Sequence, residues 1–526
     1  MASFQKYEEG GILLRPRTQA AESESSEHQE ITSPGKRRPS RREPHSSKIE
    51  KSSVVSGLLK PSAYTGLYGF HKYWGKKPVE PLQFLISALT EPGELVVDPF
   101  LGSGAVAREA LQLKRRFIGG DINPIAVRLS KFFLQPCCAE AYASALRTLE
   151  VSLRNVIDSS YQVAPFGVTS HLLWRGEELV TVWQREDGRR SRKERYPTPA
   201  DIDLAKSFAS YVPSRLRSLQ LFQNGRINSF PTLSWHNLFS GRALRNIDLL
   251  LGEIRQVQGP VRDALELTLT AAVGQMSKMV FAITSRGKTS NILSERVEVG
   301  SWVIGYWRPE THFEINVWNC FESKAKKLLK ALKDNPSRYP VSIVGDIVAG
   351  NSTVSVEMID ALQLIEDLPV GSTRLLITDP PHGDRIPYLE LSEIWNAILG
   401  DKSDFEREVV VSNAKERRKT PERYQSALDE FFSLGIDRLQ DGGFLVLLFN
   451  SRRDNEWSPI RRITGSPDMN LLGCFPMEYS ATSVVQDNRE GGMKNDYILI
   501  YSKGQPHERA VNLLKTVPGW RSGWLE

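Results

Sequence analysis

The sequence predicts an α/β protein in which a doubly wound, mostly parallel sheet is interrupted by an inserted α+β domain. Two observations lead to this prediction. Short apolar runs that end in acidic or glycine-rich turns alternate with helical segments over residues 94–121 and again over 341–449, and this alternation stops between them. Strands that alternate with helices are typical of parallel sheets, because a parallel crossover needs a helix-sized connection.

The first part of the sheet is predicted from residues 94–121. We expect a strand at 94–98, a helix at 105–113 and a second strand at 116–121. The first strand runs into the turn Asp98-Pro99-Phe100-Leu101-Gly102-Ser103-Gly104, whose glycines let the backbone turn tightly and approach a ligand closely. Ligands of open α/β sheets bind at the carboxyl ends of strands, so this turn is a predicted cofactor site.

The second part of the sheet is predicted from residues 341–501. Expected parallel strands lie at 341–346, 375–379 and 443–449, with helices at 390–399 and 423–439 and a closing antiparallel pair at 471–477 and 497–501.

Two acids end predicted strands, Asp121 the second and Asp346 the third. An acid at the end of the second strand can hold both ribose hydroxyls of a nucleoside cofactor, and Asp346 is a candidate acceptor for an adenine amine. Each has a purely structural alternative, which for Asp121 is capping of a helix that begins at Pro124.

Four regions follow from this pattern: a tail at 1–55, a first half of the sheet domain at 56–135, an insertion at 136–335 and a second half at 336–526. The tail is rich in Ser, Glu, Arg and Pro and poor in large apolar residues, so we expect it to be disordered. The insertion is predicted to contain a hairpin at 178–196, a strand at 314–318 and helices at 243–256, 261–281 and 322–332.

Composition narrows the class of protein. Of the 526 residues, 40% are hydrophobic and 25% charged, as in soluble globular proteins, and the net charge of +6 permits a polyanionic partner. Four cysteines without a CxxC pair argue against a zinc ribbon or a disulfide framework, so we expect no metal and a cytoplasmic location. The most apolar segment, 264–284, contains Glu266, Gln275 and Lys278, and is predicted to be a core helix rather than a membrane span.

The most informative motif is Asp379-Pro380-Pro381-His382, which follows an apolar run. The aspartate and a neighbouring backbone carbonyl can both accept hydrogen bonds from an exocyclic NH2 group and so orient its nitrogen lone pair. The prolines keep the loop rigid. A base that leaves the duplex needs a flat partner, and His382 is the predicted one. Together with the glycine turn, the motif predicts methyl transfer from S-adenosylmethionine (SAM) to a nucleic-acid base.

These motifs resemble those of a known enzyme family. Residues 98–104 and 379–382 are similar to motifs I and IV of the amino-methyltransferases that modify adenine N6 or cytosine N4 in DNA. His71-Lys72-Tyr73-Trp74-Gly75-Lys76-Lys77-Pro78 resembles motif X, and residues 117–124 resemble motif II. The resemblance implies a Rossmann-like methyltransferase sheet, SAM as cofactor and DNA as partner. It also implies target recognition by the insertion.

The resemblance and the strand ends together give a set of expected site residues. The expected catalytic residues are Asp379, Pro380, Pro381 and His382, and the expected cofactor-binding residues are His71, Lys72, Trp74, Lys76, Asp98, Phe100, Gly102, Ser103, Gly104, Asp121, Asn123 and Asp346. His382 stands where the family usually has Tyr, Phe or Trp. Tyr388 is a second aromatic residue that could stack on a base.

Two basic segments are candidates for nucleic-acid contact. The hairpin at 178–196 carries Arg189, Arg190, Arg192 and Lys193 close to Trp174 and Trp183. Basic side chains interleaved with aromatic ones suit phosphates and bases, although such a run also occurs at exposed hairpin tips. The segment Lys415-Glu416-Arg417-Arg418-Lys419 is the second candidate.

Three functions are compatible with these motifs. The leading one is methylation of DNA at adenine N6, favoured over cytosine N4 because many cytosine enzymes of this family have Ser where this chain has Asp379. The second is methylation of guanine N2 in tRNA or rRNA. The third is a catalytically silent SAM- or DNA-binding subunit of a modification or phage-defence complex. A restriction-modification setting with specificity subunits is also expected.

Overall fold

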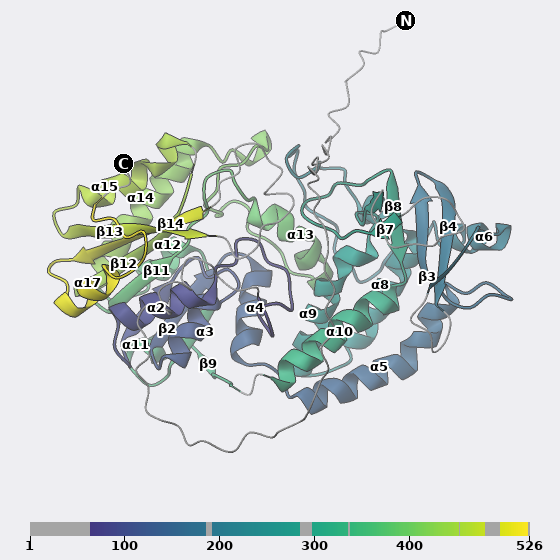
Figure 1. Ribbon diagram of the computed structural model, residues 1–526, viewed down its shortest axis with the longest axis horizontal. Helices are drawn as coiled ribbons and strands as arrows, with labels where there is room; N and C mark the ends of the chain where they lie inside the picture. The colour runs from purple at the N-terminus through teal and green to yellow at the C-terminus, as the bar shows by residue number, and fades with distance from the viewer. Residues whose placement is uncertain are drawn as a thin grey trace, which may run out of the picture. The chain divides into compact units, whose positions relative to one another are not determined.

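The computed structural model describes residues 64–185, 192–284, 297–334, 337–451, 453–478 and 495–523. The predicted tail at 1–55 and the hairpin residues Arg189 and Arg190 lie outside this part of the chain. The described residues form an eight-stranded sheet in the order β13-β14-β12-β11-β1-β2-β10-β9, with helices on both faces (Figure 1). The predicted α/β class with a mostly parallel sheet is confirmed.

The centre of the sheet is parallel and apolar on both faces. Strand β1 (Leu95–Asp98) is fully buried and pairs in parallel with β2 (Arg116–Asp121) and β11 (Thr373–Thr378). Successive side chains of a strand point to opposite faces. Val96 therefore packs with helices α2 (Val79–Leu89) and α3 (Ala105–Gln112), whereas Val97 packs with α12 (Ala361–Glu366) and α14 (Pro421–Arg438).

The predicted antiparallel pair closes one end of the sheet. Strand β14 (Asn495–Lys503) runs antiparallel to β12 (Leu439–Phe449) on one side and to β13 (Met469–Glu478) on the other. Their apolar residues extend the two cores of the parallel strands. The remaining helices of the sheet domain are α4 (Pro124–Leu134), α13 (Tyr388–Leu399), α15 (Ser458–Thr464) and α17 (Glu508–Leu514).

The prediction for the third strand was wrong. At 341–346 the chain forms only the two-residue edge strand β9 (Val341–Ser342). The short helix α11 (Val344–Val348) follows it and contains Asp346. The strand next to β2 is β10 (Val354–Met358), where Val354 and Val356 are fully buried. Ser342 donates a hydrogen bond to the Asp346 carboxylate and so ties this acid to the first turn of α11.

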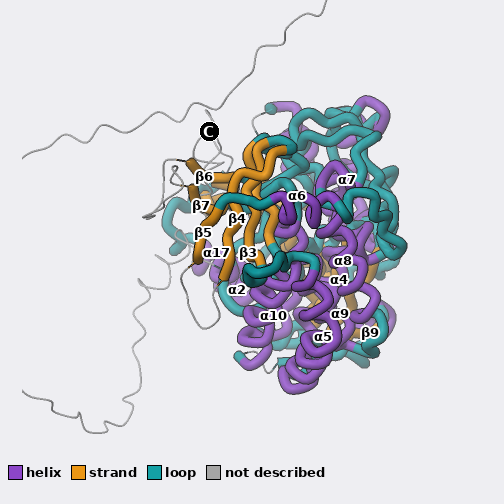
Figure 2. The backbone as a smooth tube through the Cα atoms, turned by 90° about the vertical axis from the view of Figure 1, so that its right-hand side faces the viewer, coloured by secondary structure: helices purple, strands orange, loops and turns teal. Residues whose placement is uncertain are grey.

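The insertion combines a small antiparallel sheet with long helices, as predicted. Its strands lie in the order β5-β4-β3-β8, beside the helices in Figure 2. The predicted hairpin is present as β4 and β5. The strand predicted at 314–318 ends earlier, because the Asn316 side chain accepts from Trp318 N and Asn319 N and starts a helix there. The main elements are β3 (Thr169–Arg175), β4 (Glu178–Arg185), β5 (Arg192–Arg195), β8 (Thr311–Ile315), α5 (Ala139–Ser159), α8 (Gly241–Ile254), α9 (Pro260–Val273) and α10 (Val317–Lys333).

The insertion shares its hydrophobic core with the sheet domain. This core runs from α8, α9 and α10 through α4 and α13 to residues 67–74. Trp74 stacks on Trp395 of α13 at 4.7 Å between ring centroids and 22° between ring planes, and Trp302 of the insertion meets both edge-on. The segment that resembles motif X is thereby fixed between the two regions. Among the described helices, none combines the length and the apolar character that crossing a bilayer requires.

Candidate active site

A cavity that opens to solvent lies at the carboxyl ends of the parallel strands. It is lined by the loop after β1, by residues after β2 and β11, and by the segment 73–77. The predicted site residues that line it are Trp74, Lys76, Asp98, Phe100, Gly102, Ser103, Asp121, Asn123, Asp379, Pro381 and Tyr388. Gly104, Pro380, His71, Lys72, His382 and Asp346 are not among its described lining residues.

The glycine turn after β1 forms one wall of the cavity. Gly102 and Gly104 have φ values of 53° and 77°, a region that side chains rarely adopt. The Gly102 N–H donates to Oδ2 of Asp121 at 2.7 Å, and the Asn123 N–H donates to Oδ1 at 2.8 Å. Asp121 therefore ties the glycine turn to Asn123, the N-cap residue of α4, without itself capping the helix, and it lines the cavity. Its contact with a ribose stays a prediction.

Two carboxyl groups at the cavity are held partly protonated by burial. Burial raises the pKa of Asp121 to about 6 and that of Asp98 to about 8. Asp98 accepts from the Phe100 N–H and the Thr378 hydroxyl, each at 3.2 Å, and these neutral donors only partly offset the loss of water around the carboxylate. Arrival of a cation beside these acids would favour their ionised forms.

Asp379 lies on the opposite wall and is held by a cation and an imidazole. Its Oδ2 is 3.0 Å from Lys77 Nζ, and its Oδ1 is 2.9 Å from His382 Nε2. Lys77 also contacts Asp496 Oδ2 at 2.6 Å. Burial alone would lower the pKa of Lys77, but the carboxylates of Asp379 and Asp496 outweigh it and raise that pKa well above its ordinary value. Lysine 77 therefore keeps its positive charge beside Asp379.

His382 does not occupy the position of a base-stacking partner. Only 8% of it is exposed, and its ring meets Phe449 edge-on at 4.8 Å. Its Nε2 lies 3.1 Å from the Leu448 carbonyl as well as 2.9 Å from Asp379, and Arg385 Nη1 is 3.1 Å from its Nδ1. The predicted flat surface at position 382 is thus corrected: the ring is turned into the protein, and Tyr388 is the aromatic residue of the pair that lines the cavity.

His71 and Lys72 face the insertion rather than the cavity. His71 Nε2 is 3.0 Å from the Thr270 hydroxyl, and burial lowers the pKa of His71 to about 3. Lys72 Nζ donates to the Trp302 carbonyl at 3.3 Å and lies over the Trp302 ring. Both side chains anchor the segment to its neighbour, and neither is among the described lining residues of the cavity; the cofactor contacts expected of them stay predictions.

Asp360, rather than Asp346, is the acid that follows the strand paired with β2. It follows β10 and lines the cavity, caps α12 by accepting from the Gln363 N–H at 3.0 Å, and pairs with Arg407 at 2.9 Å. The sequence signal was the alternation of apolar and polar residues at 352–358, followed by an acid. Tyr73 and Lys77 also line the cavity; they belong to the motif X-like segment but were not in the expected set of site residues. Glu408 is a lining residue that no motif indicated.

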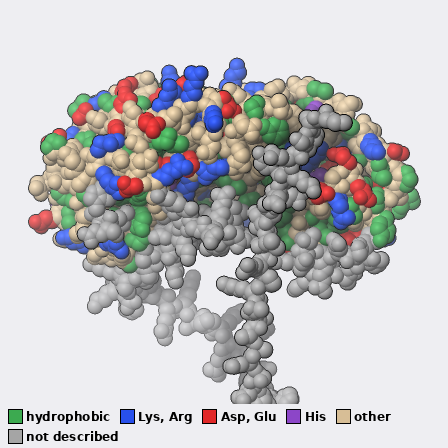
Figure 3. Space-filling view, turned by 90° about the horizontal axis from the view of Figure 1, so that it is seen from above, with side chains coloured by type: hydrophobic (Ala, Val, Ile, Leu, Met, Phe, Trp, Pro, Cys, Tyr) green, Lys and Arg blue, Asp and Glu red, His purple; other side chains and the backbone are tan. Residues whose placement is uncertain are grey.

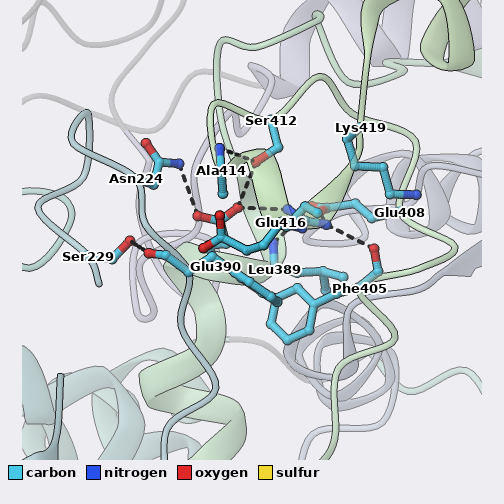
Figure 4. Close-up of polar contacts among 12 residues, drawn as sticks. Asn224, Ser229, Leu389, Glu390, Phe405, Glu408, Ser412, Ala414, Glu416 and Lys419 are labelled. Atoms are coloured by element: carbon cyan, nitrogen blue, oxygen red, sulfur yellow. Dashed lines mark hydrogen bonds and ion pairs between the residues drawn. The ribbon is translucent and has the colours of Figure 1, made fainter. Parts of the chain in front are cut away.

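A buried ionic cluster fixes the loop that carries Glu408 (Figure 4). Arg417 donates to Glu390 Oε1 at 2.7 Å and to Glu408 Oε2 at 2.6 Å, and Asn224 of the insertion donates to Glu390 Oε2 at 3.0 Å. Only 5% of Arg417 is exposed. The prediction that residues 415–419 meet a target strand is therefore wrong for Arg417, whose guanidinium is used inside the protein.

The basic residues of the hairpin are only partly described. Lys193 is exposed on β5, whereas Arg195 pairs with the buried Asp201 at 2.7 Å and lies over the Phe166 ring. On the face shown in Figure 3, lysine and arginine side chains are interspersed with acidic ones. Within the described residues, no group of three or more His, Cys, Asp or Glu side chains is placed to hold a metal ion.

A family model and curated relatives match short parts of this chain. A family model described as DNA methylase matches residues 15–132. YubD of Escherichia coli (strain K12), whose name is that of a methylase, is 52% identical over 47 residues, which are 9% of this chain and 21% of that protein. The type II methyltransferase M.XycI of Xanthomonas campestris pv. cyanopsidis is 41% identical over 58 residues, 11% of this chain and 19% of that enzyme.

The matches confirm the resemblance to DNA amino-methyltransferases, on short stretches. The chain spans about a fifth of the length of these curated relatives. A crystal structure of PH0851 aligns at 14% identity over 34% of this chain and 40% of that one, with a TM-score of 0.18, and supports nothing further.

Proposed function

We propose that this chain, whose residues 15–132 match the DNA methylase family, transfers a methyl group from SAM to the exocyclic amine of a DNA base. Adenine N6 is favoured over cytosine N4. One observation carries the proposal: the glycine turn after β1 and the Asp379-Pro380-Pro381 loop after β11 belong to neighbouring parallel strands and line the same cavity. This arrangement suits a cofactor and an acceptor amine that meet face to face.

The cavity fits a cationic nucleoside cofactor. Asp98 and Asp121 place carboxyl groups beside it, which suits the positive sulfonium, and the turn at Gly102 lets a ligand approach the backbone. The buried indole nitrogen of Trp74 beside the cavity has no partner among the described residues and can donate to a bound ligand. Bound there, SAM would supply an activated methyl group.

Asp379 receives the acceptor amine in this proposal. Its carboxylate, which pairs with Lys77, accepts hydrogen bonds from an NH2 group and turns the nitrogen lone pair toward the cofactor side of the cavity. An acid at this position also supports adenine as the base. Because Tyr388 lines the same cavity, it is the aromatic residue best placed to contact a flipped base.

Expectations about partners stay predictions. The family description and the name of the type II relative favour DNA over RNA as substrate. Specificity subunits, a restriction-modification setting and a role in phage defence remain open to test by co-purification. We propose Lys193, with its exposed side chain on β5, as one contact to the DNA backbone.

The direct test is methyl transfer by wild type and by Asp379→Ala. Labelled methyl groups from SAM should enter unmethylated DNA and not RNA with the wild type. Asp379→Ala should lose transfer by about a thousandfold, or roughly 4 kcal/mol of transition-state stabilisation, while binding SAM within about threefold of wild type. The matched control is Asp429→Ala, which removes an acid that pairs with Arg462 on the surface and should retain activity.

Label in RNA alone would replace DNA by RNA in this proposal. SAM binding without label in either nucleic acid would indicate a silent subunit. Full activity of Asp379→Ala would remove the role assigned to that carboxylate.

A further inference from the structure

The carboxylate of Asp379 belongs to a closed ring of buried polar groups. Lys77 bridges Asp379 and Asp496, at 3.0 and 2.6 Å. Arg385 Nη1 bridges Asp496 Oδ1 and His382 Nδ1, each at 3.1 Å, and His382 Nε2 returns to Asp379 at 2.9 Å. The ring joins three segments that are far apart in the sequence: the motif X-like segment, the loop after β11 and the start of β14.

The charges within this ring balance. Lys77 and Arg385 are cations, Asp379 and Asp496 are anions, and none of the Asp496 carboxylate is exposed. Burial alone would raise the pKa of Asp496, but the nearby positive charge, foremost that of Lys77, holds that pKa well below its ordinary value. A buried charge that loses one partner is strongly destabilised, so each member constrains the next.

The closed ring of polar groups also fixes which imidazole nitrogen of His382 donates a hydrogen bond. A guanidinium can only donate, so Nδ1 of His382 accepts from Arg385. With Nδ1 as the acceptor, the N–H that faces Oδ1 of Asp379 and the Leu448 carbonyl is the one on Nε2. His382 is therefore a hydrogen-bond donor to Asp379, a task that a phenyl ring cannot perform.

We propose that Lys77, His382, Arg385 and Asp496 are positioning residues that lock the plane of the Asp379 carboxylate for the acceptor amine. Each carboxylate oxygen is held by one ring member and has a second lone pair to offer to a substrate N–H. This inference rests on the proposed function and deepens it. The His at position 382 is then part of the machinery that aims Asp379, and base stacking is left to another aromatic residue.

The first test separates positioning from stacking at residue 382. His382→Phe restores a family-typical aromatic ring but removes both hydrogen bonds, and His382→Gln keeps a donor and an acceptor without a ring. If His382 positions the Asp379 carboxylate, kcat of His382→Phe falls at least tenfold while KM for DNA and Kd for SAM stay within about twofold. His382→Gln then recovers part of kcat. An active His382→Phe, or one altered only in KM, overturns the proposal.

The second test asks whether the ring acts as one unit. Lys77→Met and Asp496→Asn should each lower kcat at least tenfold, and the double variant should be no worse than the poorer single one. If the double variant lost kcat by the product of the two single losses, Lys77 and Asp496 would act independently, and joint action through Asp379 would be contradicted. Glu314→Gln is the matched control, because it neutralises another buried carboxylate paired with an arginine, and it should change the unfolding temperature without changing kcat.

A third experiment does not depend on catalysis, and it distinguishes failure of the proposed function from failure of the proposed positioning role. In a double-mutant cycle on the unfolding temperature, Lys77→Met and Asp496→Asn should lower it by less together than the sum of the single decreases. Additive decreases refute the ring itself. If the cycle shows coupling but the wild type methylates neither DNA nor RNA, the proposed function fails, and with it the catalytic role of the ring. If the wild type turns over and the ring variants keep full kcat, only this inference fails.

Discussion

Asp98 ends β1 and Asp379 directly follows the neighbouring strand β11, yet the surroundings of the two carboxyl groups are opposite. Both are followed by proline at the carboxyl end of a buried strand, and β1 and β11 pair in parallel through Val96 and Leu375. Asp98 has only neutral donors, and burial raises its pKa to about 8. Asp379 has the ammonium of Lys77 and the imidazole of His382. The local sequence places each acid, whereas the cation beside Asp379 comes from a segment far away in the sequence.

This difference assigns different tasks to the two loops. A carboxyl group that keeps its proton near neutral pH can adjust to a cationic ligand by releasing that proton. A carboxylate that is paired with a buried cation is ready to accept from an amine.

The largest effect should separate the two aspartates directly. Asp379→Ala should reduce methyl transfer to DNA by about a thousandfold, whereas Asp98→Asn should reduce it by less than about tenfold, because the amide keeps the shape of a mostly protonated carboxyl group. Initial rates at saturating SAM and DNA measure both. Equal losses in the two variants would show that the contrast in charge has no functional meaning.

The sequence alone could predict one side of this contrast. The apolar runs and the turns after them located β1, β2, β11, β12 and the antiparallel pair, and with them the glycine turn and Asp379. Those elements depend on local patterns of burial. Lys77 and Asp496 are separated by 419 positions along the chain, so no local pattern could show that they meet at Asp379.

The errors have the same origin. The third strand was placed at 341–346 because that run ends in an acid, although β10 is the segment that pairs with β2. His382 was assigned to stacking by analogy of position, and only the fold shows that Arg385 and Leu448 hold its ring inside the protein.

The next largest effect concerns the β1 side. A Cβ on Gly104 would lie 2.5 Å from Ser130 Oγ, at a φ of 77° that disfavours side chains. We expect Gly104→Ala to cost about 1–3 kcal/mol of folding stability and to weaken SAM binding by about tenfold or more. Gly93→Ala is the matched control, since its φ is 85° but no atom lies within 4 Å. Calorimetry should find that Gly93→Ala binds SAM as tightly as the wild type. If both variants lost SAM affinity to a similar extent, backbone strain alone would explain the effect of Gly104→Ala.

A smaller effect should appear in the pH dependence of stability. The folded protein keeps a proton on Asp98 up to a pKa of about 8, whereas the unfolded chain releases it near pH 4. Because the folded state binds more protons in this window, the ionisation of Asp98 lowers stability as pH rises from about 4 to about 8, by at most about 1.4 kcal/mol per pH unit. Asp98→Asn lacks this contribution. Denaturant unfolding at several pH values should therefore show that the free energy of unfolding of Asp98→Asn increases relative to that of the wild type as pH rises. If the two free energies changed with pH in parallel, the raised pKa of Asp98 would be contradicted.

The smallest effect extends the test from the cavity to the insertion. Lys193→Gln should weaken DNA binding about twofold to threefold at physiological salt and lower the salt dependence by about one counterion, because an exposed lysine contributes one phosphate contact. Lys326→Gln, an exposed lysine on α10, is the control and should leave DNA binding unchanged. Equal effects of the two variants would favour a general charge effect over a contact by β5.

The most direct test of the central claim is nucleoside analysis of DNA after incubation with SAM that carries a labelled methyl group. The wild type should place the label in N6-methyladenine, and Asp379→Ala should place none above background while still binding SAM. Label in N4-methylcytosine would keep the methyl-transfer site and change the base. Absence of label from DNA, with SAM bound, would contradict the assignment of this cavity to DNA amino-methylation.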